Sequence, residues 1–476
     1  MIFASFEFLF LFLPLFFAVY FATPFRWRNW PILILSWGFY AWWRVDFLAL
    51  LVAVTVFTFH TALAMDRAGP DTPPGRRLLL LGLAGNLGVL GYFKYANFGV
   101  ASLDALLAAA GLAPIPWAPI LLPIGLSFYV LQSVSYLIDV RRGDVPVSRR
   151  FVDYAAYKAI FAQLIAGPIV RYAEIERELR ARSHSLAQFG LGARRFMLGF
   201  AMKVCLADTL APLVDAAFAL PAPSLADAWT GAVAYTLQLF FDFAGYSAMA
   251  IGLAGICGFR FPENFADPYL AGSIQEFWQR WHMTLSRFLR DYLYIPLGGN
   301  RKGVARTYFN LFIVMVLGGL WHGANWTFVI WGAWHGAILA VERYFNWPKK
   351  ASTVFWSLPL TLLFVMLGWV MFRAPNVAGA MTMYAGMFGF NGLGLTPDVA
   401  WQLPREGMMI LAIAIAIAGF EPQLKKLAEP SLMIDGHGTA SLRAEWAPAL
   451  AMSALTVLVL MRLADQSFSP FLYFQF

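Results

Sequence analysis

Residues 229–257 read WTGAVAYTLQLFFDFAGYSAMAIGLAGIC, a run of 29 positions in which Asp242 is the only charged side chain. A helix rises about 1.5 Å per residue, so the run is long enough to cross about 30 Å of hydrocarbon. A helix that is apolar on all sides over such a length is typical of a membrane span. The stretch therefore predicts a transmembrane helix that carries one ionisable residue.

The composition of the whole chain agrees with a membrane location. Of 476 residues, 60% are hydrophobic and 13% are charged, whereas soluble domains carry about 25% charged residues. The formal net charge of +8 is interpreted as a bias of the loops, and no nucleic-acid partner is expected. The two cysteines, Cys205 and Cys257, lie in apolar stretches and do not suggest a disulfide framework.

Similar apolar runs recur along the chain and predict an all-α, polytopic integral membrane protein with about 11–12 transmembrane helices. The predicted spans lie near residues 5–22, 29–43, 46–65, 78–95, 119–139, 194–219, 229–257, 306–321, 325–342, 353–372, 406–420 and 446–463. Shorter or proline-interrupted pieces near 98–112, 155–170 and 376–391 are expected to be re-entrant or interfacial. No Lys or Arg precedes the first run, so we expect a retained span there and not a signal peptide.

Arginine-rich loops follow the first, third and fifth predicted spans, at 26–28, 66–77 and 141–150. Because basic loops stay on the cytoplasmic side, these three loops are predicted to be cytoplasmic and the N-terminus to face outward. No internal repeat is evident, which disfavours a transporter built from duplicated halves.

A polar region at 259–305 separates the long apolar runs, and its pattern predicts one amphipathic helix over 274–293. Its basic face holds Arg280 and Arg287, and Ser273 with Glu276 forms a capping box at its start. On the cytoplasmic side, this face could meet anionic lipids or phosphate groups. The alternative is a plain interfacial helix without a ligand.

Histidine can exchange a proton near neutral pH, and the chain has only six. His184 and His437 lie in polar loops, where we expect them to be solvated. His282 lies on the predicted amphipathic helix, and His322 and His335 lie in membrane segments. Ionisable residues inside a membrane are costly, so a functional role is the first hypothesis for them. For any one of these three, a hydrogen bond between helices is the alternative.

His322 stands in the stretch GGLWHGANW, residues 318–326. Its glycines allow the backbone to bend or another group to approach closely, which suggests the wall of a cavity. No second ligand lies at a metal-site spacing, so no metal is expected. The chain has no Gly-x-Ser-x-Gly elbow, phosphate loop or dinucleotide fingerprint in a suitable context. A buried general acid or base remains as the best interpretation of His322.

Six linked blocks of the chain carry a family resemblance. They read PIGLSFYVLQSVSYLIDV (123–140), QLIAGPIVRY (163–172), FFDFAGYSAMAIGL (240–253), FRFPENF (259–265), EFWQRWHMTLSRFLRDYLYIPLGGNR (276–301) and GGLWHGANWTFVIWGAWHG (318–336). Together they resemble the bacterial branch of the membrane-bound O-acyltransferase (MBOAT) family, and the resemblance runs through nearly the whole chain. It implies one transmembrane domain over 1–476 around a central tunnel, with N-terminal helices in 1–150, a catalytic core in 151–345 and C-terminal helices in 346–476.

The resemblance also implies roles for individual residues. His322 matches the catalytic histidine of the family, and His282 matches a second histidine nearer the cytoplasmic mouth of the tunnel. The possible accessory residues are His335, Asn325, Trp321 and Asp242. Relatives often have Asp where this chain has Ala248, which makes Asp242 the nearby intramembrane carboxylate; it would be either accessory to catalysis or an ion-paired structural group. Arg280, Arg287 and Lys302 are the candidate donor-binding residues, because cations on the cytoplasmic side could meet the phosphates of coenzyme A.

The activity that the resemblance implies is O-acetylation of an exported polysaccharide, with alginate as the first candidate. Acetyl-CoA would be the donor substrate, no cofactor would be bound, and a periplasmic polysaccharide acetyltransferase would be the partner protein. The expected location is the bacterial inner membrane, with membrane lipids around the spans. The alternatives are acetylation of another exopolysaccharide, D-alanyl transfer within the family, or a transporter or scaffold for polysaccharide precursors.

Overall fold

The computed structural model describes residues 3–347, 354–424 and 442–465, and every regular element within these ranges is a helix. The all-α prediction is therefore confirmed. The chain divides into two compact units, which are described separately. The first comprises Met1–His184 and Cys257–Pro262, and the second comprises Ser185–Ile256 and Glu263–Phe476.

Five helices in the described residues are long and apolar enough to cross a membrane: Val45–Ala68, Pro73–Ala109, Leu186–Ala219, Leu225–Ile256 and Val304–His322. Three shorter apolar helical segments, Glu7–Ala22, Ser357–Arg373 and Ala449–Ala464, accompany them. The chain is thus an integral, multi-pass membrane protein, while the number of about 11–12 spans stays a prediction.

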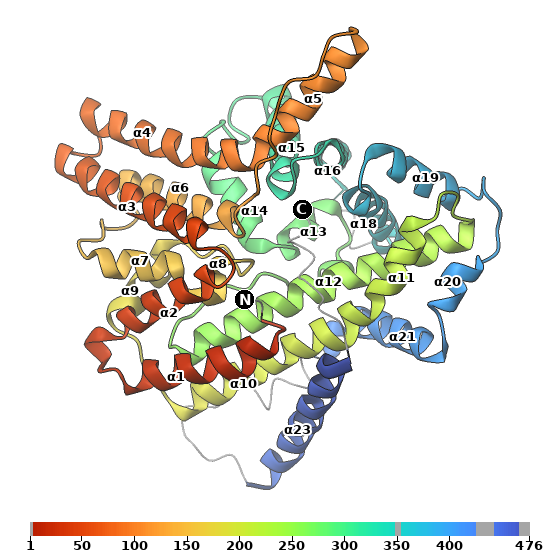
Figure 1. Ribbon diagram of the computed structural model, residues 1–476. Helices are drawn as coiled ribbons and strands as arrows, with labels where there is room; N and C mark the ends of the chain where they lie inside the picture. Colours follow the sequence, from red (N-terminus) through yellow and green to blue (C-terminus); the bar gives the residue numbers. More distant parts are fainter. Residues whose placement is uncertain (1–2, 348–353, 425–441, 466–476) are drawn as a thin grey trace. The chain divides into compact units, whose positions relative to one another are not determined.

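The first unit contains the helices from the N-terminus to the loop at His184. They are η1 (Glu7–Phe12), α1 (Leu13–Ala22), η2 (Phe25–Trp27), α2 (Asn29–Ala41), α3 (Val45–Ala68), α4 (Pro73–Leu90), η3 (Gly91–Tyr95), α5 (Ala96–Ala109), α6 (Leu126–Arg142), α7 (Phe151–Ala159), α8 (Phe161–Leu164) and α9 (Tyr172–Arg180). Figure 1 shows α3, α4 and α6 side by side, and the contacts among them agree. These three helices pack against one another within the first unit.

One predicted span starts later than expected. The apolar run at 119–139 becomes helical only at Leu126, after an extended segment with prolines at 114, 116, 119 and 123. Proline lacks the N–H that a helix interior needs, so the segment stays extended. Gly125 then turns into α6 with φ +75°, and a Cβ there would lie 2.4 Å from the carbonyl oxygen of Leu164.

His184 is not the solvated side chain that its polar loop suggests. It is half-buried, its Nε2 lies 2.9 Å from the hydroxyl of Tyr20, and its Nδ1 lies 3.1 Å from Nη1 of Arg28. Partial burial, followed by the charges of Arg28 and Arg182, lowers the pKa of His184. The prediction of a solvated residue is therefore wrong here, while His437 lies outside the described residues.

The second unit holds the remaining helices. They are α10 (Leu186–Ala201), η4 (Met202–Ala207), α11 (Asp208–Ala219), α12 (Leu225–Ile256), η5 (Pro268–Leu270), α13 (Ile274–Arg280), α14 (Met283–Leu289), η6 (Arg290–Tyr294), α15 (Val304–His322), α16 (Trp326–Tyr344), α18 (Ser357–Arg373), α19 (Val377–Met387), α20 (Pro397–Trp401), α21 (Arg405–Gly419) and α23 (Leu442–Asp465). The apolar run at 229–257 lies in α12 up to Ile256, and α12 is the longest of these helices.

Paired glycines bring α10 and α12 close together. A Cβ on Gly199 would lie 2.4 Å from the carbonyl oxygen of Gly245, and a Cβ on Gly245 would lie 2.6 Å from that of Gly199. Gly192 and Gly252 repeat this arrangement at 2.6 and 2.5 Å. Small residues let membrane helices approach until their backbones touch. Figure 1 shows α10 and α12 running alongside each other.

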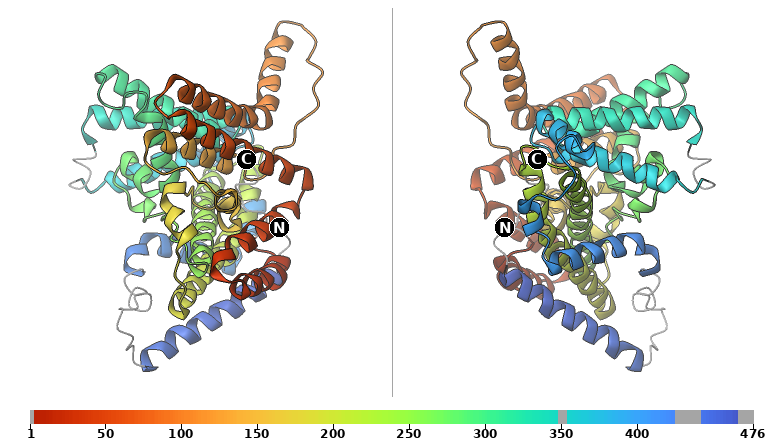
Figure 2. Two further views of the ribbon diagram at one scale, coloured as in Figure 1. Left: turned by 90° about the vertical axis from the view of Figure 1, so that its left-hand side faces the viewer. Right: turned by 90° about the vertical axis from the view of Figure 1, so that its right-hand side faces the viewer.

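The helices α15 and α16 form a hairpin that also depends on glycine; both are teal in Figure 2. A Cβ on Gly319 would lie 2.2 Å from the carbonyl oxygen of Phe328, and one on Gly323 would lie 2.0 Å from the Phe328 ring. The glycines of GGLWHGANW therefore permit close approach of the two helices.

Candidate active site

His322 is the last residue of α15, where the chain turns into α16. Its side chain is 4% exposed. Its ring centroid lies 5.1 Å from that of Trp321, 5.3 Å from Trp331 and 5.4 Å from Phe372. The hairpin thus places the imidazole among aromatic rings, as expected for a histidine in a membrane protein interior.

His282 lies where the predicted amphipathic helix breaks. α13 ends at Arg280, His282 adopts a left-handed conformation with φ +43° and ψ +52°, and α14 begins at Met283. The prediction of one continuous helix over 274–293 is therefore wrong. The capping box expected at the start of this helix is present in part. The Ser273 hydroxyl accepts a hydrogen bond from the backbone N–H of Glu276. The Glu276 carboxylate accepts one from the backbone N–H of Gly272, one residue before Ser273.

The break buries His282 completely, at 0% exposure. The ring packs edge-on against Phe243 of α12 at 4.7 Å and lies 5.9 Å from Trp321. Burial lowers the pKa of His282 to about 3, so the imidazole is neutral at physiological pH. A neutral imidazole has one nitrogen that donates and one that accepts a hydrogen bond.

His282 and His322 are neighbours although 39 residues separate them in sequence. Their ring centroids are 6.1 Å apart and the ring planes form an angle of 62°. Two buried imidazoles at this distance can both reach a small group bound next to them. Because they are enclosed by Phe243, Trp321, Trp331 and Phe372, water access is restricted, and a proton transfer would take place in a medium of low polarity.

His335 belongs to the same cluster through an intervening ring. It is 0% exposed, and Trp331 lies 5.0 Å from it and 5.3 Å from His322. Phe277 stacks on His335 at 6.4 Å, and Trp278 packs edge-on at 5.3 Å. Within the described residues, neither ring nitrogen of His335 has a hydrogen-bond partner. A hydrogen bond between helices, the alternative for this residue, is therefore not what the structure shows.

The other three accessory candidates have separate positions. Trp321 lies against both histidine rings. Asn325 caps α16 by accepting from the backbone N–H of Thr327, and its amide donates to the carbonyl oxygen of Pro375. Asp242 is 1% exposed and pairs with Lys203 of η4 at 2.8 Å. Asp242 is therefore part of a buried ion pair, which is the second of the two roles considered for it from the sequence.

The donor-binding candidates lie on α13, α14 and the loop after η6. Arg280 pairs with Glu276 of the same helix turn at 2.5 Å and donates to the carbonyl oxygen of Asp267. Arg287 is half-buried and Lys302 is exposed.

Two functional candidates have no counterpart in the sequence interpretation. Asn264 contacts His282, and Glu342 at the end of α16 accepts hydrogen bonds from the backbone N–H groups of Ile274 and Gln275 at 2.6 and 3.0 Å. Both residues are polar, and neither stands at a helical or metal-site spacing in the sequence from its hydrogen-bond partners. The only signal was the position of Asn264 in the FRFPENF block.

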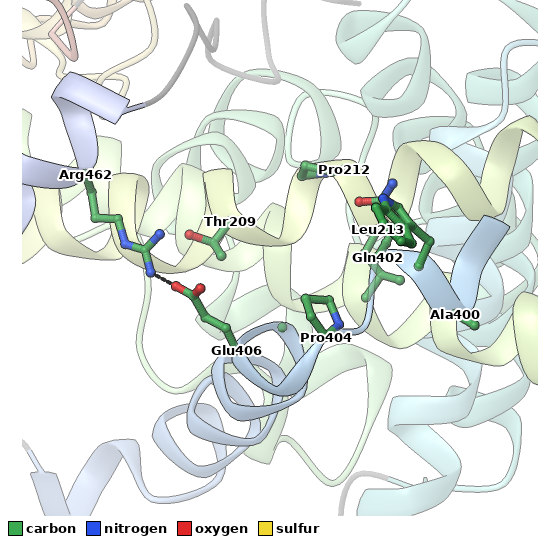
Figure 3. A pocket seen from close by; sticks show the side chains of 10 residues that line it. Thr209, Pro212, Leu213, Ala400, Gln402, Pro404, Glu406 and Arg462 are labelled. Carbon is green, nitrogen blue, oxygen red and sulfur yellow. Dashed lines mark hydrogen bonds and ion pairs between the residues drawn. The ribbon is translucent and has the colours of Figure 1, made fainter. Parts of the chain in front are cut away.

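Within the described residues, no group of three or more His, Cys, Asp or Glu side chains could hold a metal. A cavity of about 550 Å³ opens elsewhere in the second unit, between α11, α20, α21 and α23 (Figure 3). Thr209, Gln402 and the ion pair of Arg462 with Glu406 line it. It contains no histidine, so the chemistry of the imidazole cluster does not extend to it.

Helices long enough to cross a membrane, together with a cluster of buried histidines, fit an integral membrane enzyme. The family model of the membrane-bound O-acyltransferases, MBOAT, matches residues 145–384. A probable alginate O-acetylase, AlgI, of Azotobacter vinelandii is 50% identical over the full length of both chains. The peptidoglycan O-acetyltransferase of Helicobacter pylori is 34% identical and covers 98% of this chain and 96% of its own.

The teichoic acid D-alanyltransferase of Bacillus subtilis is 27% identical, over 52% of this chain and 68% of its own. All three relatives are named for transfer of an acyl group. The chain belongs to the membrane-bound O-acyltransferase family. Because this family consists of acyltransferases, the chain is an acyltransferase, and the alternatives of a transporter or a scaffold no longer apply.

Proposed function

We propose that this O-acyltransferase passes acetyl groups from cytoplasmic acetyl-CoA across the bacterial inner membrane for O-acetylation of an exported polysaccharide, alginate. The buried pair of His282 and His322 carries the proposal, because acyl transfer to a hydroxyl needs a proton acceptor shielded from water. Similarity to alginate O-acetylases over the full length supports acetyl as the group and alginate as the acceptor.

The chemistry assigned to the site is one displacement. His322, as a neutral base, takes the proton of the acceptor hydroxyl while the hydroxyl oxygen attacks the thioester carbonyl. The new C–O bond forms, the C–S bond breaks, and the coenzyme leaves as a thiol after taking up a proton. General base catalysis of this kind contributes about 10²–10⁴-fold in rate. Enclosure by aromatic rings supports transfer to the acceptor over hydrolysis.

The donor is proposed to approach by α13 and α14. Arg287 and Lys302 would meet the phosphates of coenzyme A, together with Arg280. Since Arg280 already pairs with Glu276, a phosphate would take the place of that carboxylate. On the other side of the membrane, a periplasmic polysaccharide acetyltransferase would receive the acetyl group and pass it to the polymer.

The test compares His322→Ala and His322→Gln with the wild type in the native host, with ester-linked acetate measured on purified alginate and on peptidoglycan. Both variants should lose alginate acetylation by two orders of magnitude or more, because glutamine can hydrogen-bond but accepts no proton at neutral pH. His60→Ala is the matched control, since His60 is exposed and its ring lies against that of the neighbouring Phe59. It should keep wild-type acetylation.

Wild-type acetylation in His322→Ala at normal expression would remove the catalytic role. Substantial activity in His322→Gln would leave a positioning role and no proton chemistry. Loss of acetate from peptidoglycan with unchanged alginate would show that the acceptor polymer is wrong while the transferase activity is right.

A further inference from the structure

The orientation of the Asn264 side chain can be deduced from its donors. Its Oδ1 position lies 3.2 Å from the backbone nitrogen of Thr284 and 2.9 Å from the hydroxyl of the same residue. A backbone N–H can only donate, so the atom that faces it must be the amide oxygen and not the amide nitrogen. The opposite orientation would place two donors against each other.

The tautomer of His282 follows from this assignment. Nδ1 of His282 lies 3.1 Å from the same Asn264 oxygen. Since that oxygen only accepts, Nδ1 must carry the hydrogen, and in the neutral ring Nε2 then bears the lone pair. In the described part of the chain, Nε2 of His282 has no hydrogen-bond partner. The ring therefore presents an unused acceptor among Phe243, Trp321 and His322.

Asn264 also fixes the backbone that carries His282. Its carbonyl oxygen accepts from the N–H of Met283 at 2.9 Å, and Ala266 donates to the carbonyl oxygen of Arg280 at 2.9 Å. A left-handed conformation is unfavourable for a non-glycine residue, and these bonds on both sides of His282 hold it there. The His282 side chain makes no cap bond to α14, so Asn264 supplies the acceptor for the first turn.

We propose that Asn264 is a positioning residue for acyl transfer, which holds His282 in the Nδ1–H tautomer so that Nε2 serves as a hydrogen-bond acceptor beside His322. This rests on the proposed function, and it adds a residue that neither the histidine pattern nor the helix pattern indicates. The acceptor nitrogen can accept a hydrogen bond from the N–H of His322 after that ring has taken the proton of the hydroxyl. A ring in the other tautomer would present a donor there and could not accept this hydrogen bond.

The chain offers two informative substitutions at this position. Asn264→Asp keeps an acceptor oxygen for His282 and Thr284, and it removes only an amide nitrogen that has no partner within the described residues. Asn264→Leu has a similar volume and removes the acceptor. Asn86→Leu is the matched control for loss of a buried amide: Asn86 is 0% exposed and bonds Thr58 and Gly82, not a histidine.

Activity gives the first readout. Asn264→Leu should lower kcat about 10–100-fold with little change in KM for acetyl-CoA, which is the usual effect of losing the partner that orients a functional histidine. Asn264→Asp should keep activity at alkaline pH and lose it as the pH falls, because a carboxylate beside Nδ1 favours the protonated ring, whose Nε2 no longer accepts. Asn86→Leu should keep the wild-type pH profile. A purely structural role of Asn264 would give the Asp variant that profile as well.

The second readout needs no substrate and separates this proposal from the proposed function. ¹⁵N NMR of histidine-labelled protein in detergent, with the His282 signals assigned by their loss in His282→Gln, reports which ring nitrogen is protonated. The wild type should show protonated Nδ1 and bare Nε2, and Asn264→Leu should lose this preference. Protonated Nε2 in the wild type would overturn the proposal, whatever the acceptor polymer is. Should the Leu variant fail to fold, the wild-type tautomer and the pH profile of Asn264→Asp still decide.

Discussion

His282 combines complete burial with a neutral ring, and this combination has a thermodynamic consequence. Burial lowers the pKa of His282 to about 3 in the folded protein, whereas an unfolded histidine titrates near 6.5. Between these two values the unfolded chain binds a proton that the folded chain does not. The free energy of unfolding should therefore fall as the pH falls below about 6.5, and the loss should be complete near the folded pKa.

A stability measurement tests this prediction. From pH 7 to pH 5, His282 alone should reduce the free energy of unfolding by about 2 kcal/mol. His282→Gln has no proton to gain, and its amide can still donate to Asn264, so its thermal unfolding in detergent should depend less on pH over this interval. An identical pH dependence in the variant and the wild type would show that His282 is not a buried neutral group.

Individual residues also show what sequence patterns can identify. His322 and His335 are identifiable because ionisable residues are rare in apolar segments, and His282 because it lies in one of the blocks that resemble the family. The structure brings the three rings into one cluster. Asn264 was not identifiable in this way. Its role depends on a contact with a residue 18 positions away, and Asn264 itself lies in a segment without regular periodicity.

At the scale of the element, packing between α10 and α12 depends on backbone contact at glycine. Gly245→Ala should destabilise the protein by about 1–3 kcal/mol, the usual cost of overpacking. Its Cβ would lie 2.6 Å from the carbonyl oxygen of Gly199 and 3.2 Å from the backbone nitrogen of Lys203, so the helices would have to separate. The same separation would disturb the ion pair of Lys203 with Asp242.

Gly255 provides a control on the same helix. A Cβ there would have nothing within 4 Å, and alanine favours a helix over glycine by up to about 1 kcal/mol. Gly255→Ala should therefore leave the unfolding temperature unchanged or raise it, while Gly245→Ala lowers it. Equal effects of both substitutions in thermal unfolding would show that glycine propensity, and not close packing, governs α12.

The helices themselves were predictable to the extent that they depend on local pattern. The apolar run at 229–257 became α12, because length and hydrophobicity are sufficient for a span. The break at Trp281 and His282 was not predictable, since no Gly or Pro marks it and the stabilising hydrogen bonds come from Asn264 and Ala266. Lys203, by contrast, is a charged residue within the apolar run at 194–219, so the sequence alone could have suggested it as the partner of Asp242.

At the scale of the whole molecule, both the sequence and the structure limit how the chain can be oriented in the membrane. The loops at 66–77 and 141–150 are joined by ion pairs of Arg141 with Asp71 and of Arg149 with Asp66, at 2.5 and 2.9 Å. They must therefore lie on the same side of the membrane, as the arginine pattern predicts. That this side is cytoplasmic, and the N-terminus periplasmic, is our proposal from the excess of basic residues.

Cysteine labelling can decide the orientation, because one long helical segment separates two exposed sites. Pro73–Ala109 has 37 residues, and its helical path of about 55 Å bends between α4 and α5 (Figure 1) but still exceeds the hydrocarbon thickness. Its two ends should lie on opposite sides. In a chain without Cys205 and Cys257, we expect Ala113→Cys to react with an impermeant maleimide in intact spheroplasts. Arg76→Cys should react only after permeabilisation. The reverse pattern would invert the proposed topology and place the candidate donor cations on the periplasmic side.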